Sequence, residues 1–236
     1  GYSPTSGIIY PASDRPEDIE AARKKYFSMP EDDSNWTWNV AWWSDPVLLG
    51  KYPEEGLKKY EKYLPKITEE DMRLISEPID VYGQNIYNGR AFRMGADGNP
   101  EEVGRVPGAG KTAVNWPVTP ECLYWGPKFL YERYKKPIYI TENGMACHDI
   151  VSLDQRVHDP NRIDFLARYL HELKRAAEEI DLRGYFQWSL MDNFEWEKGY
   201  AERFGIVYVD FETQERILKD SAYWYRDVIQ TNGRDL

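Results

Sequence analysis

Cysteine and histidine are scarce in this chain, and long apolar runs are missing from it. Its 236 residues include only two cysteines, Cys122 and Cys147, so we expect no disulfide framework. The three histidines, His148, His158 and His171, lack the spacing of a metal site. We therefore expect neither a metal nor a cofactor.

Signals for secretion or membrane insertion are also missing. The chain opens Gly1-Tyr2-Ser3-Pro4, without a charged segment followed by an apolar one, and has no apolar run of spanning length. The net charge of −10 disfavours phosphate backbones and anionic membranes, because like charges repel. We expect no nucleic acid and no membrane as partner, and a cytoplasmic location unless a segment before Gly1 carries a signal.

Aromatic residues, in contrast, are abundant. They make up 15% of the chain, mostly as 18 tyrosines and 9 tryptophans, while hydrophobic residues together make up 42%. This composition indicates a globular protein. Flat aromatic faces with a polar edge suit sugar rings, although large cores use them equally. No linker-like stretch divides the chain, so we expect a single domain over residues 1–236.

Strand-like and helix-like segments alternate in the second part of the chain. Strands are expected over residues 79–85, 136–142 and 183–190, and the helices that follow them over residues 119–134, 159–180 and 219–230. This alternation predicts an α/β fold with parallel strands. A further short strand is expected over residues 205–210, ahead of a turn at Thr213-Gln214.

The first part of the chain is predicted to be mainly helical, with a strand remnant within residues 1–9. Helices are expected over residues 16–29, within residues 36–50, over residues 54–63, and after a capping box that begins at Thr68. Residues 88–118 are rich in Gly, Asn and Pro. They predict a long excursion of the kind that forms active-site walls.

The chain is organised around the stretch from Lys136 to Gly144, which reads Lys-Pro-Ile-Tyr-Ile-Thr-Glu-Asn-Gly. An apolar, β-branched run between Pro and Asn-Gly is typical of a buried strand that stops where its polar residues begin. Glu142 would then lie at the carboxyl end of a parallel strand, where α/β folds bind ligands. The alternative is that Thr141 to Gly144 form an ordinary solvated turn.

A second stretch, Gly184 to Trp196, has the same organisation. It is an apolar run that ends in a polar and aromatic loop, which would place Trp188, Glu195 and Trp196 near the same mouth as Glu142. Taken one at a time, such aromatic residues belong to a core more often than to a ligand wall.

Together, the two stretches resemble the signatures of the family 1 glycoside hydrolases, the retaining β-glucosidase type. Ile140 to Gly144 match the nucleophile motif of that family, Ile-Thr-Glu-Asn-Gly. Trp188 to Trp196 match its sugar-binding loop. The similarity continues through Gly199-Tyr200 and Arg203-Phe204-Gly205 to Ser221-Ala222-Tyr223-Trp224-Tyr225.

The resemblance implies half of a (β/α)8 TIM barrel. The strands of this chain look like strands five to eight of the family's barrel, each with its helix. The first half, with the Asn-Glu-Pro motif that holds the acid/base glutamate, has no counterpart, since Asn-Glu-Pro occurs nowhere in the sequence. We therefore expect residues 1–236 to be a C-terminal half-barrel whose N-terminal half is absent.

The resemblance also implies roles for particular residues. Glu142 would be the nucleophile, and Tyr87 would orient it, because Asn85-Ile86-Tyr87 matches the family's Asn-Tyr-Tyr except at Ile86. An ordinary buried tyrosine is the alternative at that position. The residues implied in substrate binding are Asn85, Trp116, Trp188, Glu195, Trp196 and Phe204. Glu195 disfavours 6-phosphorylated glycosides, because its carboxylate would repel the phosphate.

Two functions remain open. The first is hydrolysis of terminal β-D-glucosides with release of glucose, by a retaining mechanism in which this chain is the nucleophile-bearing half. The partners would be a β-glucoside or oligosaccharide and the missing N-terminal half-barrel, and the chain alone would be nearly inactive. The second is a catalytically inactive half-barrel that binds sugar, or that assembles with a second copy of itself into a homodimeric barrel.

Overall fold

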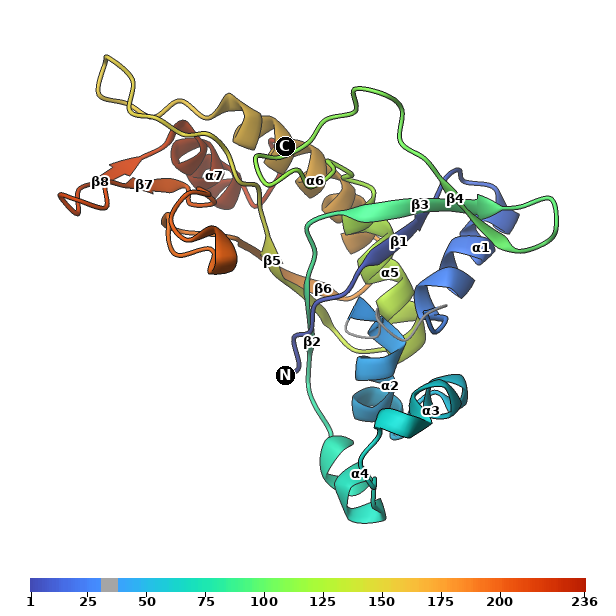
Figure 1. Ribbon diagram of the computed structural model, residues 1–236. Coiled ribbons are helices and arrows are strands. Elements are labelled where there is room, and N and C mark those ends of the chain that lie inside the picture. Colours follow the sequence, from blue (N-terminus) through green and yellow to red (C-terminus); the bar gives the residue numbers. More distant parts are fainter. Residues whose placement is uncertain (31–37) are drawn as a thin grey trace.

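A computed structural model describes residues 1–30 and 38–236 of the chain (Figure 1). Trp36, which belongs to the stretch of one expected helix, lies outside the described residues. Where the chain is described, no helix combines the length and the apolar character that crossing a membrane requires.

A parallel sheet forms the centre of the molecule. Its strands are β2 (Tyr82–Asn85), β5 (Ile138–Asn143) and β6 (Leu182–Gln187), hydrogen-bonded in the order β2-β5-β6 with both pairs parallel. Isolated parallel bridges add residues 2–5 as a fourth member beside β2. The predicted neighbouring parallel strands are confirmed, and their carboxyl ends come together at one end of the sheet.

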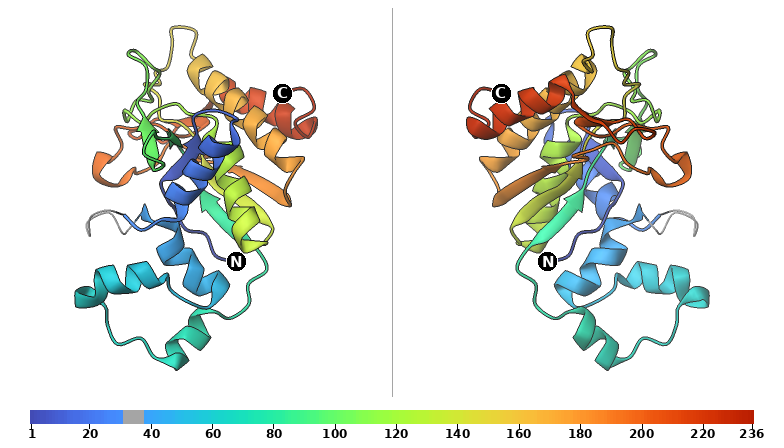
Figure 2. Two further views of the ribbon diagram at one scale, coloured as in Figure 1. Left: turned by 90° about the vertical axis from the view of Figure 1, so that its right-hand side faces the viewer. Right: turned by 90° about the vertical axis from the view of Figure 1, so that its left-hand side faces the viewer.

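Three helices lie along one face of this sheet: α1 (Pro16–Phe27), α5 (Cys122–Tyr134) and α6 (Pro160–Ala177) (Figure 2). Ile138 and Ile140 of β5 are fully buried in the core beneath them, since alternate residues of a strand face the same side. The core also contains Ile8, Leu123, Phe129, Leu130, Phe165 and Tyr169. The fold is thus α/β, and among the described residues the sheet is open rather than closed into a ring.

A second sheet, of order β1-β3-β4, corrects one prediction. Its strands are β1 (Ile8–Pro11), β3 (Gly89–Met94) and β4 (Pro100–Val103), with β1 parallel and β4 antiparallel to β3. Part of the excursion predicted over residues 88–118 is therefore a β-hairpin. Gly98 turns this hairpin with φ of 79°, and Gly95 N donates to Asn99 O at 2.9 Å.

The short helices of the first part of the chain gather at one end of the molecule, at the bottom of Figure 1. They are α2 (Val40–Leu49), α3 (Glu54–Tyr60), the 3-10 helix η2 (Glu61–Tyr63) and α4 (Glu69–Ile75). The capping box predicted before α4 is confirmed. Thr68 Oγ1 accepts from Asp71 N at 3.1 Å, and the Asp71 carboxylate accepts from Thr68 N at 2.9 Å.

The C-terminal part adds four elements: η3 (Trp196–Lys198), β7 (Val207–Val209), β8 (Arg216–Leu218) and α7 (Asp220–Gln230). The strand expected over residues 205–210 does form, as β7. It pairs antiparallel with β8 and lies outside the parallel sheet. The turn expected at Thr213-Gln214 joins the two strands, and Gln214 adopts a positive φ of 65° there.

Candidate active site

Glu142 is the penultimate residue of β5, so the alternative of a solvated turn is wrong. Its carbonyl oxygen accepts from Ile86 N at 2.9 Å, and it stands in register with Asn85 of β2. The Asn143 side chain donates to Ile86 O at 2.8 Å. Hydrogen bonds to the end of β2 and to Ile86, which follows it, therefore fix the backbone of Glu142 at the carboxyl end of the sheet.

Asn85 ends β2 beside Glu142. Its side-chain oxygen accepts a hydrogen bond from Thr141 Oγ1 at 2.7 Å, and the Thr141 hydroxyl also lies 2.6 Å from Ser3 Oγ. Three of the four parallel segments thus contribute to one hydrogen-bonded row. This row fixes the orientation of the Asn85 amide next to the carboxylate.

The hydroxyl of Tyr87 donates a hydrogen bond of 2.7 Å to Oε2 of Glu142. Burial raises the pKa of Tyr87 well above its usual range, and the hydrogen bond to Glu142 and the negative charges of Glu142 and Glu195 raise it further. The phenol therefore stays protonated and remains a donor. Such a hydrogen bond orients the Glu142 carboxylate.

Trp116 and Phe204 enclose the ring of Tyr87. The ring centroids lie 5.1 Å apart for Tyr87 and Trp116, 6.2 Å for Tyr87 and Phe204, and 5.9 Å for Trp116 and Phe204. Phe204 is only 2% exposed. The structure therefore brings together three predicted site residues that are far apart in the sequence, and their packing limits the rotation of Tyr87.

Glu195 and Trp188 form the second side of the site. Burial raises the pKa of the Glu195 carboxyl, a hydrogen bond from the Trp188 side chain lowers it, and the charge of Glu142 raises it again, with a net rise. The two carboxylates therefore influence one another across the site. Trp188 follows β6 directly, and the peptide bond between Trp188 and Ser189 is cis.

Trp196 occupies a different setting from the other predicted site residues. It is the first residue of η3, and it is 79% exposed. The side chain thus projects into solvent beside the site, and its predicted role in binding stays a prediction.

The ends of β5 and β6 approach each other at Gly144. A Cβ atom on Gly144 would lie 1.7 Å from the carbonyl oxygen of Trp188, which no real side chain tolerates. Trp188 N also donates to Asn143 O at 2.8 Å. Backbone contact alone therefore sets the spacing between β5, which carries Glu142, and the strand that leads to Trp188.

The site thus consists of a carboxylate with a phenolic donor at the carboxyl end of a parallel sheet. Comparison of the whole chain with known protein families gives a result consistent with this geometry. A family model for glycosyl hydrolase family 1 matches residues 2–234. The chain belongs to glycosyl hydrolase family 1. The predicted resemblance is thereby confirmed.

Two of the curated relatives in the family are named β-glucosidase A. β-Glucosidase A of Thermotoga maritima is 44% identical over 232 residues, which are 97% of this chain and 50% of the relative. β-Glucosidase A of Acetivibrio thermocellus is 41% identical over 234 residues, 95% of this chain and 49% of that protein. The chain therefore spans about half the length of the curated relatives it matches.

Solved family 1 structures share this fold. The β-glucosidase of Thermotoga maritima in complex with glucoimidazole aligns with a TM-score of 0.79 at 43% identity, over 98% of this chain and 50% of that one. The same enzyme has also been solved with deoxynojirimycin, with the same score and coverage. By family, the chain belongs with the glycoside hydrolases.

Sequence reasoning missed a group of buried charges behind the family 1 site. We call this group the ionic cluster, and its members are Asp149, Asp159, Arg162, Asp192, Arg203 and Lys219. Its contacts join residues up to 70 positions apart, such as Asp149 and Lys219. Periodicity carries no signal for such contacts.

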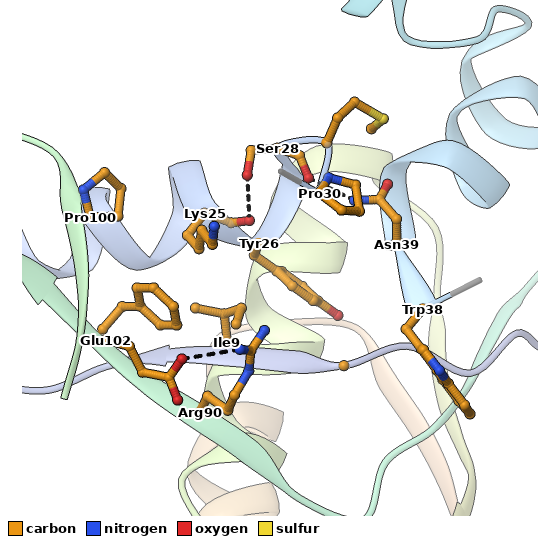
Figure 3. Close-up of a pocket in the computed structure, with 13 residues that line it drawn as sticks. Ile9, Lys25, Tyr26, Ser28, Pro30, Trp38, Asn39, Arg90, Pro100 and Glu102 are labelled. Carbon is orange, nitrogen blue, oxygen red and sulfur yellow. Dashed lines mark hydrogen bonds and ion pairs between the residues drawn. The ribbon is translucent and has the colours of Figure 1, made fainter. Parts of the chain in front are cut away.

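A separate hollow of about 610 Å³ lies between α1 and the β1-β3-β4 sheet (Figure 3). Its described lining includes Lys25, Tyr26 and Trp38, together with Arg90 and Glu102, which pair at 3.0 Å. None of the predicted site residues is among them. Another hollow, of about 630 Å³, is lined by Trp188 and by residues 189–194 that follow it, so of the two hollows it is this one that adjoins the candidate family 1 site. No metal-binding group of carboxylates, imidazoles or thiols stands in the described parts of the chain.

Proposed function

We propose that residues 1–236 are the nucleophile-bearing half of a retaining β-glucosidase that releases glucose from terminal β-D-glucosides. In this proposal residues 2–5, β2, β5 and β6 are strands five to eight of an eight-stranded barrel. One observation carries it: the 2.7 Å hydrogen bond from Tyr87 to Glu142 at the carboxyl end of the sheet. A donor of this kind holds a nucleophilic carboxylate in the orientation that attack requires.

Glu142 attacks the anomeric carbon in this mechanism and forms a glycosyl ester, which water then hydrolyses. Tyr87 holds the carboxylate for the attack. A second carboxyl group, about 5 Å away, must protonate the departing oxygen in a retaining enzyme. The resemblance assigns that group to the Asn-Glu-Pro motif of the other half of the barrel, which has no match in these residues.

The sugar would lie between Glu142 and the Trp188 side of the site. Glu195 is suited to accept hydrogen bonds from two adjacent hydroxyl groups, and the indole of Trp188 supplies a flat wall. Asn85 and Trp196 add polar groups at the rim, while Trp116 lines the side of the leaving group. The anionic Glu195 would repel a 6-phosphate, which supports an unphosphorylated glucoside as substrate.

The partner in this proposal is a complementing half-barrel. The parallel sheet ends at β6 and at residues 2–5, and open strand edges invite further strands. Phe186 and Leu190, on and just after β6, are 56% and 64% exposed, which supports an apolar partner there. A second copy of this chain offers the same two edges and is the competing partner.

Reassembly tests the proposal. Residues 1–236 are mixed with the N-terminal half of the Thermotoga maritima relative, and the pair is called the reassembled enzyme below. We expect the chain alone to be nearly inactive on cellobiose and alkyl β-glucosides, because a positioned general acid contributes about a hundred- to ten-thousandfold in rate. The added half should restore turnover, and Glu142→Ala in the mixture is the control.

Two outcomes would overturn the proposal. Robust activity of the pure 236-residue chain would require an acid/base residue within it. A stable two-chain particle that excludes the added half and never turns over glucosides would favour the homodimeric barrel instead. Size-exclusion chromatography with light scattering separates these cases from a productive complex.

A further inference from the structure

The ionic cluster is buried and balanced in charge. It contains three cations, Arg162, Arg203 and Lys219, and three carboxylates, Asp149, Asp159 and Asp192. The side chains of Lys219 and Arg162 are completely buried. Buried ion pairs contribute little net stability, since desolvation costs as much as attraction returns. We therefore look for the role of the ionic cluster in the positions of the chain segments that it joins.

Lys219 joins the two strand ends that form the site. Its Nζ donates to Asp149 Oδ2 at 2.6 Å and to Asp192 Oδ1 at 2.8 Å. Asp149 lies seven residues after Glu142 in the chain, and Asp192 lies four residues after Trp188. Arg162 makes a parallel link, from Asp149 at 2.7 Å to the carbonyl oxygen of Arg203 at 2.8 Å.

Asp192 holds both ends of the segment that carries the predicted sugar contacts. We call residues 192–209 the recognition loop. Asp192 Oδ1 accepts from Gly205 N at 3.0 Å, and Oδ2 accepts from Arg203 Nη1 at 2.6 Å and from Val209 N at 3.4 Å. The start and the end of the loop are thus joined through the Asp192 carboxylate. Lys219 links this carboxylate to Asp149, in the segment that follows Glu142.

The middle of the recognition loop has weaker support of its own. Trp196 is largely exposed, and η3 is a single 3-10 turn, in which Lys198 N donates to Glu195 O at 2.9 Å. Phe204, next to Gly205, packs against Tyr87, and Tyr87 donates to Glu142. The position of Glu195 and Phe204 relative to the nucleophile thus depends on how the base of the loop is held.

We propose that Lys219 and Asp192 are positioning residues for sugar recognition, which hold the recognition loop at a fixed place relative to the nucleophile strand. The inference rests on the proposed function, because the loop's ligand is taken to be the glucosyl group. Neither residue touches that group. Both act through the backbone that presents Glu195 and Phe204.

Hydrogen–deuterium exchange of the 236-residue chain tests the holding role without any need for activity. Lys219→Met keeps most of the length of the side chain and removes the ammonium group with its charge. We expect backbone amides of residues 192–209 to exchange at least tenfold faster, with those of β5 and α5 unchanged. Lys128→Met is the matched control, since Lys128 of α5 also pairs with a carboxylate, that of Glu179, and neither residue belongs to the ionic cluster.

Two results of this measurement would overturn the proposal. One is unchanged exchange in the recognition loop, and the other is a uniform rise over the whole chain, which would indicate a general role in stability. Asp192→Asn provides the second variant, since it keeps the shape and removes the charge. If Lys219→Met does not fold, Asp192→Asn must give the same local increase.

The functional measurement uses the reassembled enzyme and glucoimidazole, the ligand seen in the Thermotoga maritima relative. We expect Lys219→Met to weaken glucoimidazole binding at least tenfold and to raise the KM for glucosides, with kcat within about twofold. A loss of folded enzyme would lower kcat at unchanged KM. The proposal would be overturned if Lys219→Met loosened the loop but left an active enzyme with unchanged affinity for glucoimidazole. If the reassembled enzyme without any substitution showed no turnover, that result would count against the proposed function only.

Discussion

The two sides of the site are built in different ways. On the proposed nucleophile side, Glu142 and Asn85 lie in paired strands, and Tyr87 is enclosed by Trp116 and Phe204. On the proposed sugar side, Glu195 and Trp196 lie on a loop with Trp196 exposed at its middle and buried ion pairs at its base. In a strand, the backbone hydrogen bonds to the neighbouring strand fix the position of each residue. A loop lacks this regular pairing, so side-chain contacts must fix its position.

The largest expected effect lies on the nucleophile side. Glu142→Ala should lower turnover of the reassembled enzyme by roughly ten-thousandfold or more, because alanine cannot form the glycosyl ester. Initial rates on an aryl β-glucoside measure this. The thermal midpoint should stay unchanged, and a variant that keeps more than a small fraction of the activity would contradict the assignment.

On the sugar side, Glu195→Ala should cost about 3 kcal/mol of transition-state stabilisation, or roughly a hundredfold in kcat/KM. The loss comes from charge-assisted hydrogen bonds to sugar hydroxyl groups. The comparison substrate is a deoxy-glucoside that lacks those hydroxyls, on which the loss should be much smaller. Equal losses on both substrates would make Glu195 a structural residue.

Tyr87→Phe tests the enclosed donor by itself. The ring keeps its packing against Trp116 and Phe204, and only the hydrogen bond to Glu142 is lost, at a cost of about 1.5 kcal/mol or roughly tenfold in kcat. Tyr124→Phe is the control, because Tyr124 also donates to a carboxylate, that of Glu179, at 2.5 Å on α5. Equal effects of the two substitutions on kcat would refute a special role for Tyr87.

The smallest effect, on thermal stability, is expected at the exposed ion pairs that His158 forms with Asp154 and Asp220. His158 Nδ1 lies 2.6 Å from Asp220 and Nε2 lies 3.0 Å from Asp154, and these two hydrogen bonds raise the pKa of His158 above its usual 6.5. A raised folded-state pKa adds stability that is complete below the unfolded-state pKa and is lost as pH rises through the folded-state pKa.

His158→Gln should therefore lower the thermal midpoint slightly at pH 5.5 and leave it unchanged at pH 9. The effect is small because the ion pairs are solvent-exposed. His171→Gln, on the exposed side of α6, is the control for removing a histidine. A midpoint difference that is equal at both pH values would show that packing, and not charge, is what His158 contributes.

The sequence predicted the nucleophile side better than the sugar side for a physical reason. Strand periodicity and the Asn-Gly end placed Glu142 correctly, and the capping box at Thr68 marked a helix start, because both signals are local. The hairpin of β3 and β4 was hidden by the Gly and Asn content that also forms its turn. The tie from Lys219 to Asp149 and Asp192 depends on tertiary packing, which no local pattern encodes.

The contact at Gly144 has a consequence for how such a site changes over evolutionary time. Any side chain there would push the Trp188 carbonyl away, so the gap between β5 and the Trp188 backbone cannot be changed in small steps at this position. If the proposed function holds, we expect substitutions that adapt the site to a wider or narrower sugar to fall at other positions. Glycine, which has no side chain to vary, therefore keeps this spacing constant wherever it is retained at position 144.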